Sequence, residues 1–180
     1  MCVVVLLAGC QKTPAVFSIT VKDSYGNRVS SAEWQHNKTS VVFFLSPQCP
    51  LCQSYSLNIR QLQQQFENDS VKFYAIIPDS SFSNQTINEF KKTYSLSLPV
   101  WRDDRKQLTR LLGAKVTPEV FVLNEKATVL YSGRIDNWAY AVGQKRQVIT
   151  QHELLDALTA VSQHKEITVK KTKAIGCFIE

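Results

Sequence analysis

Two cysteines separated by two residues form the clearest chemical motif of the chain, Cys49-Pro50-Leu51-Cys52. At the start of a helix, unpaired backbone N–H groups and the helix dipole stabilise an anion, so the thiolate of Cys49 is favoured over its thiol. Pro50 suits the first helical position, where its missing N–H would be unpaired in any case. One helical turn then brings the sulfur of Cys52 within bonding distance of the sulfur of Cys49. The motif therefore predicts a reversible disulfide.

The segments on either side of the motif predict a strand before it and a helix after it. Residues 41–45 (VVFFL) are five consecutive apolar residues, which is typical of a strand buried on both faces of a sheet. After the motif, apolar residues recur every three or four positions, which predicts an amphipathic helix packed on that sheet. These positions are Leu51, Tyr55, Ile59, Leu62 and Phe66.

The rest of the chain alternates strand and helix patterns. The further predicted elements are a strand at 16–21, a strand at 71–77, a helix from a capping box at Thr86–Glu89 to about Tyr94, a helix at 104–112 ended by Gly113, a hairpin of strands 119–123 and 128–131, and a helix capped at 150–153. This order predicts an α/β fold with a central mixed sheet flanked by helices. A β extension precedes it, and a tail with a strand-like stretch at 167–169 follows it.

The first ten residues, MCVVVLLAGC, resemble a bacterial lipoprotein signal. Small residues just before a cysteine, after a hydrophobic stretch, predict that lipid is attached to Cys10 and that the peptide is cut before it. A buried first strand is the alternative. We expect a signal and tether at 1–15, a domain at 16–163 and a tail at 164–180. The protein would then be lipid-anchored in the bacterial cell envelope, facing the periplasm.

The cysteine count leaves one thiol over. Of five cysteines, Cys2 would leave with the signal and Cys10 would carry lipid, so Cys49, Cys52 and Cys177 remain. Outside the cytoplasm an odd number means that at least one cannot pair within the chain.

The apolar end of the tail predicts where Cys177 lies. Ile175, Phe178 and Ile179 surround it, so the tail should pack back onto the domain, and Gly176 permits the bend. Near the CPLC turn, Cys177 would be a relay thiol that attacks the disulfide or captures an oxidised Cys49. A buried, inert cysteine is the equal alternative.

Four stretches of the sequence resemble the thioredoxin-like redoxin superfamily. They are FSITVKDSYGNRVS, VVFFLSPQCPLC, VTPEVFVLN and VLYSGRID, and they are most similar to extracytoplasmic thiol–disulfide oxidoreductases and the related AhpC/TSA domains. The resemblance implies a thioredoxin-like fold, with Cys49 as the attacking thiolate and Cys52 as the resolving thiol. It also implies that Thr117-Pro118 forms a cis-proline turn facing them, and that the partners are protein thiol or disulfide clients and an upstream redox partner.

The sequence departs from the family pattern at two places. Gln48 stands where a Trp often precedes the first cysteine, and residues 41–45 carry no buried acid. Glu119, next to the predicted cis-proline, is a possible proton acceptor in its place. The long segment 133–146 resembles an extended end found in some redoxin-domain proteins, and Arg134, Asp136 and Tyr140 there are candidates for a docking surface, unless the loop is simply solvated.

Four other functions remain open. A thiol peroxidase of the AhpC/TSA type would use the hydroxyl of Ser46, but Val42 stands where such enzymes have a proline. A copper-binding assembly protein on this fold separates its cysteines by three residues instead of two. A zinc site needs a second ligand pair that the scattered histidines do not supply, and a structural disulfide closing so short a loop stabilises little. We therefore expect no metal and no cofactor.

The net charge of +6 does not indicate nucleic-acid binding. Basic residues are interspersed with acidic ones, and the densest cluster is only Lys170, Lys171 and Lys173. Nucleic-acid-binding domains usually carry a basic stripe on one face. The expected partners are therefore proteins and, through the lipid, a membrane.

Overall fold

The computed structural model describes residues 14–180. The predicted lipidation site Cys10 and most of the predicted signal lie outside the described residues. Within residues 14–180, no helix is both long and apolar enough to cross a membrane.

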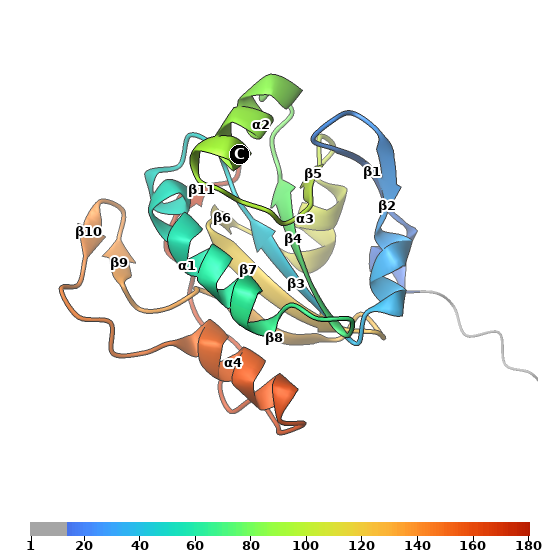
Figure 1. Cartoon of the computed structure of the whole chain (residues 1–180). Coiled ribbons are helices and arrows are strands. Elements are labelled where there is room, and N and C mark those ends of the chain that lie inside the picture. The colour runs from blue at the N-terminus through green and yellow to red at the C-terminus, as the bar shows by residue number, and fades with distance from the viewer. Residues whose placement is uncertain (1–13) are drawn as a thin grey trace, which may run out of the picture.

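A seven-stranded mixed sheet forms the centre of the molecule (Figure 1), in the order β2-β1-β5-β4-β3-β7-β8. Neighbours β3 and β4, and β4 and β5, are parallel, whereas the other pairs are antiparallel. This confirms the predicted mixed α/β class. The strands are β1 (Thr20–Asp23), β2 (Arg28–Ser30), β3 (Thr39–Phe44), β4 (Val71–Ile77), β5 (Val100–Arg102), β7 (Glu119–Asn124) and β8 (Val129–Gly133).

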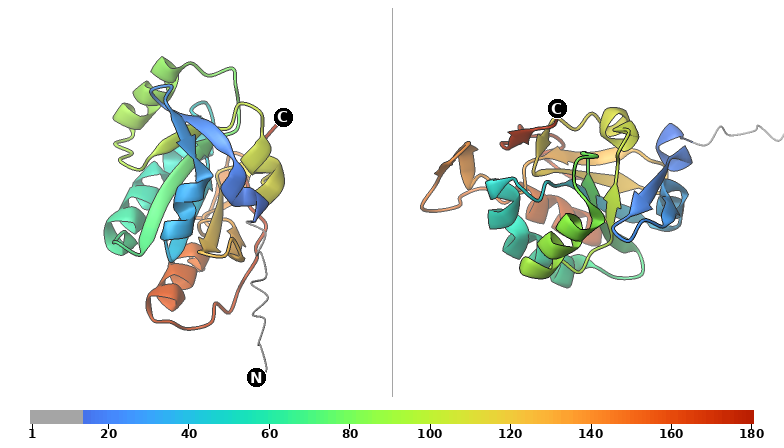
Figure 2. Two further views of the ribbon diagram at one scale, coloured as in Figure 1. Left: turned by 90° about the vertical axis from the view of Figure 1, so that its right-hand side faces the viewer. Right: turned by 90° about the horizontal axis from the view of Figure 1, so that it is seen from above.

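Helices cover both faces of the sheet (Figure 2). On one face lie α1 (Pro50–Phe66), α2 (Asn84–Thr93) and α4 (Glu153–Ser162). On the other lie α3 (Gln107–Leu112) and the 3-10 helices η1 (Ala15–Ser18) and η2 (Ser31–His36). The central strand β3 is buried along its whole length, as its apolar run predicts. Its side chains alternate between two cores, Val41 and Phe43 facing the α1 side and Val42 and Phe44 facing the other.

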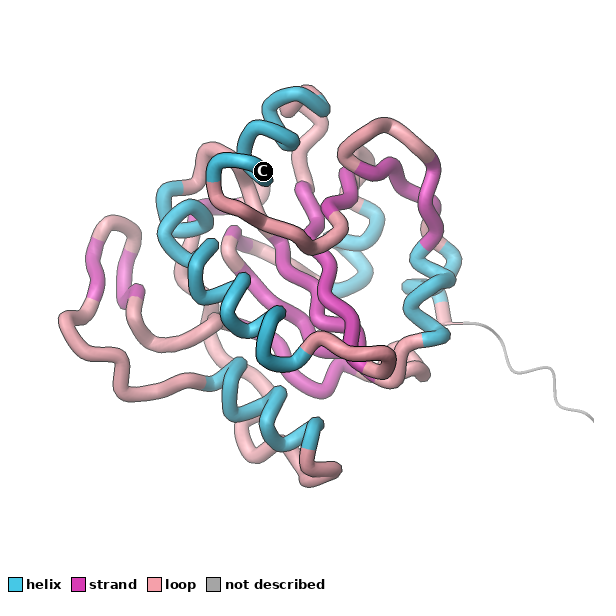
Figure 3. Tube along the Cα trace, viewed as in Figure 1, coloured by secondary structure: helices cyan, strands magenta, loops and turns pink. Residues whose placement is uncertain are grey.

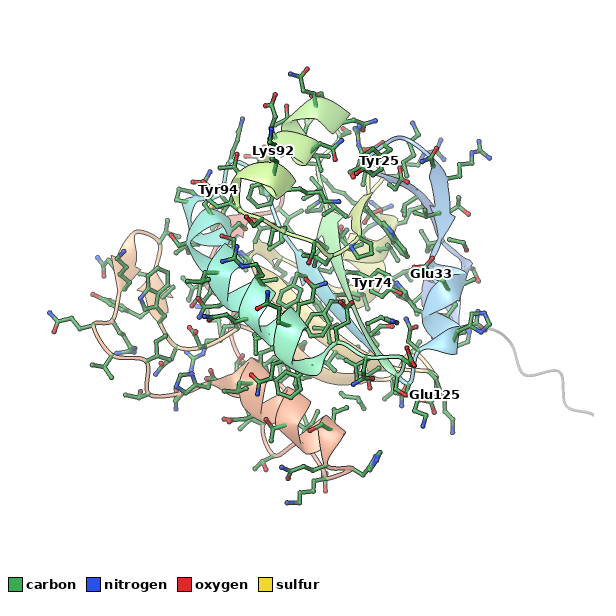
Figure 4. All side chains as sticks on the ribbon, in the orientation of Figure 1. Tyr25, Glu33, Tyr74, Lys92, Tyr94 and Glu125 are labelled. Carbon is green, nitrogen blue, oxygen red and sulfur yellow. The ribbon has the colours of Figure 1, made fainter. Side chains whose placement is uncertain are left out.

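Aromatic side chains fill the second core. Trp34 stacks on Trp101 with ring centroids 5.3 Å apart. Tyr74 points to the same region, beside the 3-10 helix that carries Glu33 (Figure 4), and its hydroxyl accepts a hydrogen bond from Asn37 Nδ2 at 3.0 Å. Burial raises the pKa of Tyr74 to about 12. This core fixes the N-terminal β extension to the domain.

The predicted strand at 16–21 was wrong in its first half. Residues 15–18 form η1, and the strand β1 begins only at Thr20. Val16 and Phe17 are both buried, whereas neighbouring strand residues point to opposite faces. A helical turn, closed by the bond from Phe17 N to the carbonyl of Pro14, lets both side chains reach the core.

Two predicted helix caps were also wrong. Ser83 caps α2, its Oγ accepting from Thr86 N at 3.1 Å, so the helix begins before the predicted capping box. The residue before α4 is His152, which makes no side-chain cap bond. Thr150 instead accepts a hydrogen bond from Asn137 Nδ2 at 2.7 Å. Both predictions failed because a capping pattern in the sequence does not show which polar side chain is free to cap the helix and which one is bonded elsewhere in the fold.

The C-terminal tail runs from the end of α4 back behind α1 to the start of that helix (Figure 1), as its apolar end predicts. Most of the tail is loop (Figure 3). Residues 167–169 form no strand; Lys171 instead forms a bridge beside Ser132 of β8. The tail ends in the short strand β11 (Cys177–Phe178), which pairs antiparallel with β6 (Val116–Thr117). A separate hairpin, β9 (Ala139–Ala141) and β10 (Gln144–Lys145), projects from the domain (Figure 1).

Candidate active site

The CPLC motif lies where the central strand passes into the first helix. β3 ends at Phe44, and a short turn closed by the bond from Cys49 N to the carbonyl of Ser46 leads into α1. Cys49 is the N-cap residue and Pro50 the first helical residue. Cys49 therefore lies at the start of the helix, as predicted, and the unpaired N-terminal N–H groups of the helix lie where they can stabilise a Cys49 thiolate.

Cys52 is completely buried one turn into α1. Its sulfur accepts a hydrogen bond from the backbone N–H of Ser46 at 3.4 Å. Burial, together with the neighbouring sulfur of Cys49, raises the pKa of Cys52 well above its ordinary value. At neutral pH Cys52 is thus a protonated thiol.

Cys49 is the ionised member of the pair. Hydrogen bonds from the thiols of Cys52 and Cys177 lower its pKa to about 4, against the opposing effect of burial. In its protonated form the Cys49 thiol donates to the carbonyl oxygen of Thr117 at 3.1 Å. Ionisation removes that donor, and the backbone N–H groups of Cys52 and Cys177 then stabilise the anion together with the two neighbouring thiols. Only 2% of Cys49 is exposed.

The predicted proline turn lies directly against Cys49. The Thr117–Pro118 peptide bond is cis and joins the short strand β6 to β7. The carbonyl that faces the Cys49 sulfur belongs to Thr117, so the turn presents backbone rather than side chain to the reactive thiol.

Glu119, predicted as a possible proton acceptor, has backbone partners instead. Its Oε2 accepts hydrogen bonds from the N–H groups of Lys115 at 2.7 Å and Val116 at 3.3 Å. These bonds close the loop that contains β6 and the cis-proline. The structure therefore gives Glu119 a positioning contact, and a part in proton transfer stays a prediction.

Cys177 is the third thiol of the site. Its sulfur lies 2.7 Å from the sulfur of Cys49, although 128 positions separate the two residues in the chain. Burial and the neighbouring Cys49 raise the pKa of Cys177 to about 12. Cys177 therefore lies next to the CPLC turn, as predicted. The alternative, an inert buried cysteine, does not explain why its sulfur contacts the reactive one.

A cavity of about 390 Å³ opens beside two of the three sulfurs. It borders both Cys49 and Cys177, and the charged side chains of Asp79 and Lys106 contribute to its wall. Its remaining lining residues are Ser46, Gln48, Pro78, Phe82, Thr117, Phe178, Ile179 and Glu180. The tail contributes Cys177 and the three residues after it to the lining, and the turn before α1 contributes Ser46, Gln48 and Cys49.

A buried pair that the sequence did not suggest supports the helix of the motif. Tyr55 lies one turn beyond Cys52, and its hydroxyl donates to Asp136 Oδ1 at 2.6 Å while accepting from Ala139 N at 3.3 Å. Burial and the carboxylate raise the pKa of Tyr55. Asp136 is only 3% exposed, so its assignment to a docking surface was wrong. No local spacing connects two residues 81 positions apart.

The other two docking candidates differ from one another. Arg134 forms an ion pair with Glu153 at the start of α4 and a hydrogen bond to Gln151 at 2.7 Å, so it ties the loop to that helix. Tyr140 is half exposed, with Arg146 over its ring. In the part of the chain that the structure describes, no group of three His, Cys, Asp or Glu side chains is arranged to hold a metal ion.

Comparison with known proteins agrees with this architecture. The family model described as the AhpC/TSA family matches residues 12–132. No curated protein gives a significant sequence match. A hypothetical protein from Sinorhizobium meliloti 1021 shares the fold with 21% identity and a TM-score of 0.79, covering 93% of this chain and 92% of that one.

Two further structures carry descriptions of activity. One is a secreted Mycobacterium tuberculosis disulfide oxidoreductase homologous to E. coli DsbE, with 19% identity, a TM-score of 0.60 and coverage of 80% of this chain and 96% of that one. The other is the bacterioferritin comigratory protein of Xanthomonas campestris, described for alkyl peroxide reduction, with 16% identity, a TM-score of 0.62 and coverage of 85% and 95%. At these identities the likeness establishes a thioredoxin-like fold.

Proposed function

The chain belongs to the AhpC/TSA family, and from this premise we propose that it is a thiol–disulfide oxidoreductase whose redox pair is Cys49 and Cys52. The observation that carries the proposal is the difference between the two thiols. Cys49 begins a helix and has a lowered pKa, whereas Cys52 is buried one turn away with a raised pKa. A nucleophile and a resolving thiol need this asymmetry, because only the thiolate attacks a disulfide.

In the reducing direction the reaction has two exchange steps. The Cys49 thiolate attacks one sulfur of a client disulfide, so a mixed disulfide forms and the other client sulfur leaves as a thiolate that takes up a proton. Cys52 then loses its proton and attacks the sulfur of Cys49, which releases the second client thiol. Two electrons pass to the client, and the protein is left with a Cys49–Cys52 disulfide. The oxidising direction is the reverse sequence.

The positions of the sulfurs suit these steps. A thiolate with a low pKa is also a good leaving group, so Cys49 is released readily when another thiolate attacks the sulfur bonded to it. Cys52 is protected by burial from reacting with clients directly. The cis-proline turn places the Thr117 backbone beside Cys49, where an extended client segment can add to the edge of β6.

We also propose that the protein acts outside the cytoplasm, held to the envelope membrane by lipid on Cys10. The lipoprotein-like sequence at residues 1–10 supports this location, and the neighbour from M. tuberculosis is described as secreted. Protein clients and an upstream redox partner follow from the proposed reaction.

The test combines a redox titration with cysteine variants. Cys49→Ser should abolish reduction of insulin disulfides, and Cys52→Ala combined with Cys177→Ser, which removes both neighbouring thiols, should accumulate mixed disulfides between Cys49 and clients. Ser54→Ala, on the exposed side of the same helix, is the matched control and should keep wild-type activity. A potential near about −270 mV would indicate reduction of clients, and one near about −120 mV their oxidation.

Peroxide reduction and copper binding are the alternatives that the same samples distinguish. Val42 occupies a fully buried position of β3, where the peroxidase pattern has proline, and this departure favours disulfide exchange. If the reduced protein consumed alkyl peroxide rapidly and left insulin intact, the peroxidase alternative would replace the proposal. Tight copper binding by the reduced form without disulfide exchange would favour the assembly protein.

A further inference from the structure

The C-terminal strand β11 occupies the edge of the active site at which a client segment would bind. It pairs antiparallel with β6, with Cys177 opposite Thr117 and Phe178 opposite Val116. The pairing continues with a hydrogen bond from Ile179 N to the carbonyl of Lys115 at 3.0 Å. Because Thr117 directly precedes the cis-proline, the tail lies in the place of an external strand, with its cysteine against Cys49.

We infer that residues 176–178 act as a tethered client strand, in which Cys177 exchanges disulfides with Cys49. The register of this strand on β6 then shows which external clients the site accepts. This inference rests on the proposed function and adds to it a third redox thiol and a class of substrate.

Gly176 shows that the fit of the strand is specific. A Cβ atom built on Gly176 would lie 2.1 Å from the carbonyl oxygen of Thr117 and 2.6 Å from its carbon. Real Cβ contacts are never so short, and both atoms belong to the backbone of the turn, so a larger residue cannot be accommodated by moving a side chain. The residue before the exchanging cysteine must therefore be glycine for the strand to approach this closely.

The tail is also held on the domain just before the strand. The hydroxyl of Thr172 contacts the hydroxyl of Tyr131 at 2.8 Å and accepts from Arg134 N at 3.1 Å. Only a few residues separate this anchor from Cys177, so the thiol is supplied to Cys49 at a high effective concentration. The anchor at Thr172 and the strand pairing at Cys177 thus both favour a reaction between Cys177 and Cys49 within the same chain.

The exchange needs no outside oxidant or reductant. Starting from the Cys49–Cys52 disulfide, the thiolate of Cys177 attacks the sulfur of Cys49. The Cys49–Cys177 bond forms, the Cys49–Cys52 bond breaks, and the proton lost by Cys177 is taken up by Cys52. The number of disulfides is unchanged. In the product, the half-buried Cys177 is the sulfur nearer to solvent, because Cys49 is 2% exposed and Cys52 is fully buried.

The register defines the substrate class. The preferred clients present an extended segment with glycine immediately before the cysteine, for the reason given for Gly176, and clients without that glycine, such as insulin, exchange more slowly. The residue after the cysteine is unrestricted in size, because the side chain of Phe178 at that position is 84% exposed. External clients of this kind compete with the tail for the edge of β6.

The first test maps disulfides in the full chain after oxidation in a glutathione buffer. We expect Cys52→Ala to form the Cys49–Cys177 bridge, and Cys52→Ala combined with Gly176→Ala to lose at least about nine-tenths of it, a tenfold change that corresponds to about 1.4 kcal/mol. Phe178→Ala in the same Cys52→Ala background is the matched control, since its side chain lies mostly outside the contact, and it should retain the bridge. No bridge in Cys52→Ala, or an equal bridge with Gly176→Ala, would overturn the inference.

The second test supplies the strand from outside. The full chain with Gly176→Ala and Cys177→Ser, whose own tail is displaced, is reduced and mixed with the peptide TKAIGCFIE carrying thionitrobenzoate on its cysteine. The Cys49 thiolate should attack the peptide sulfur and release thionitrobenzoate, and a peptide with alanine in place of its glycine should react at least about tenfold more slowly, equivalent to about 1.4 kcal/mol. Equal rates for the two peptides would overturn the substrate class.

The two proposals fail differently. If the wild-type protein reduces insulin but Cys49 and Cys177 never bridge, the tethered strand is wrong and the oxidoreductase stands. If the bridge forms but neither insulin nor the activated peptide exchanges with Cys49, the oxidoreductase is wrong, and the client interpretation of the tail is refuted with it.

Discussion

The redox potential of the Cys49/Cys52 pair should vary with pH at half the slope of ordinary thiols. Reduction of the disulfide adds two electrons, and two protons are taken up if both products are thiols. Here the pKa of Cys49 is lowered to about 4 and that of Cys52 is raised. Between about pH 5 and 8 the reduced protein therefore holds Cys49 as the thiolate and takes up one proton. For a two-electron couple this gives a slope of about −30 mV per pH unit instead of about −59 mV.

The slope should steepen as the pH falls toward the pKa of Cys49. Below that value Cys49 is protonated in the reduced state and the second proton is taken up, so about −59 mV per pH unit is expected. The protein would be equilibrated in dithiothreitol buffers of set ratio at each pH, quenched with acid, and its thiols counted by mass after alkylation under denaturing conditions.

Cys177→Ala tests the physical cause of the low pKa. The thiol of Cys177 is one of the donors to the Cys49 sulfur, so its removal should raise the pKa of Cys49 and move the change of slope to higher pH. Phe178→Ala, the neighbouring exposed position, is the control and should leave the profile unchanged. A slope of about −59 mV per pH unit across the range from pH 5 to 8 in the wild-type protein would refute the assignment of Cys49 as the ionised thiol.

Two further predictions concern the helix support and the anchor. Tyr55→Phe should lower the free energy of unfolding by about 2 kcal/mol, because it removes a bond to the buried carboxylate of Asp136 and a partner of Ala139 N. Urea unfolding would measure this, with the partly exposed Tyr94→Phe as a control; a loss below about 0.5 kcal/mol would contradict the argument. Cys10→Ser should release the protein from bacterial membranes in a fractionation experiment or block its processing, and unmodified Cys10 in a soluble mature protein would exclude the lipid anchor.

Local pattern was enough to predict the strand, turn and helix around the redox motif. The apolar run of β3 and the three-to-four-residue period of α1 are local properties, and both elements formed where they were predicted. Cys49 at the helix start follows from these two elements alone. The order of strands and helices was sufficient for the α/β class, and the motifs for the redoxin family.

Tertiary structure decided which distant residues join the site. An apolar tail predicts that Cys177 returns to the domain, but only the chain path places its strand on β6 and its sulfur 2.7 Å from Cys49. The same holds for Asp136, which the sequence suggested for the surface and which is buried on Tyr55. Glu119 likewise found backbone N–H groups of Lys115 and Val116 as partners. Periodicity records which face of an element is buried, whereas the partner of a polar side chain depends on how separate elements pack, and that information has no local signature in the sequence.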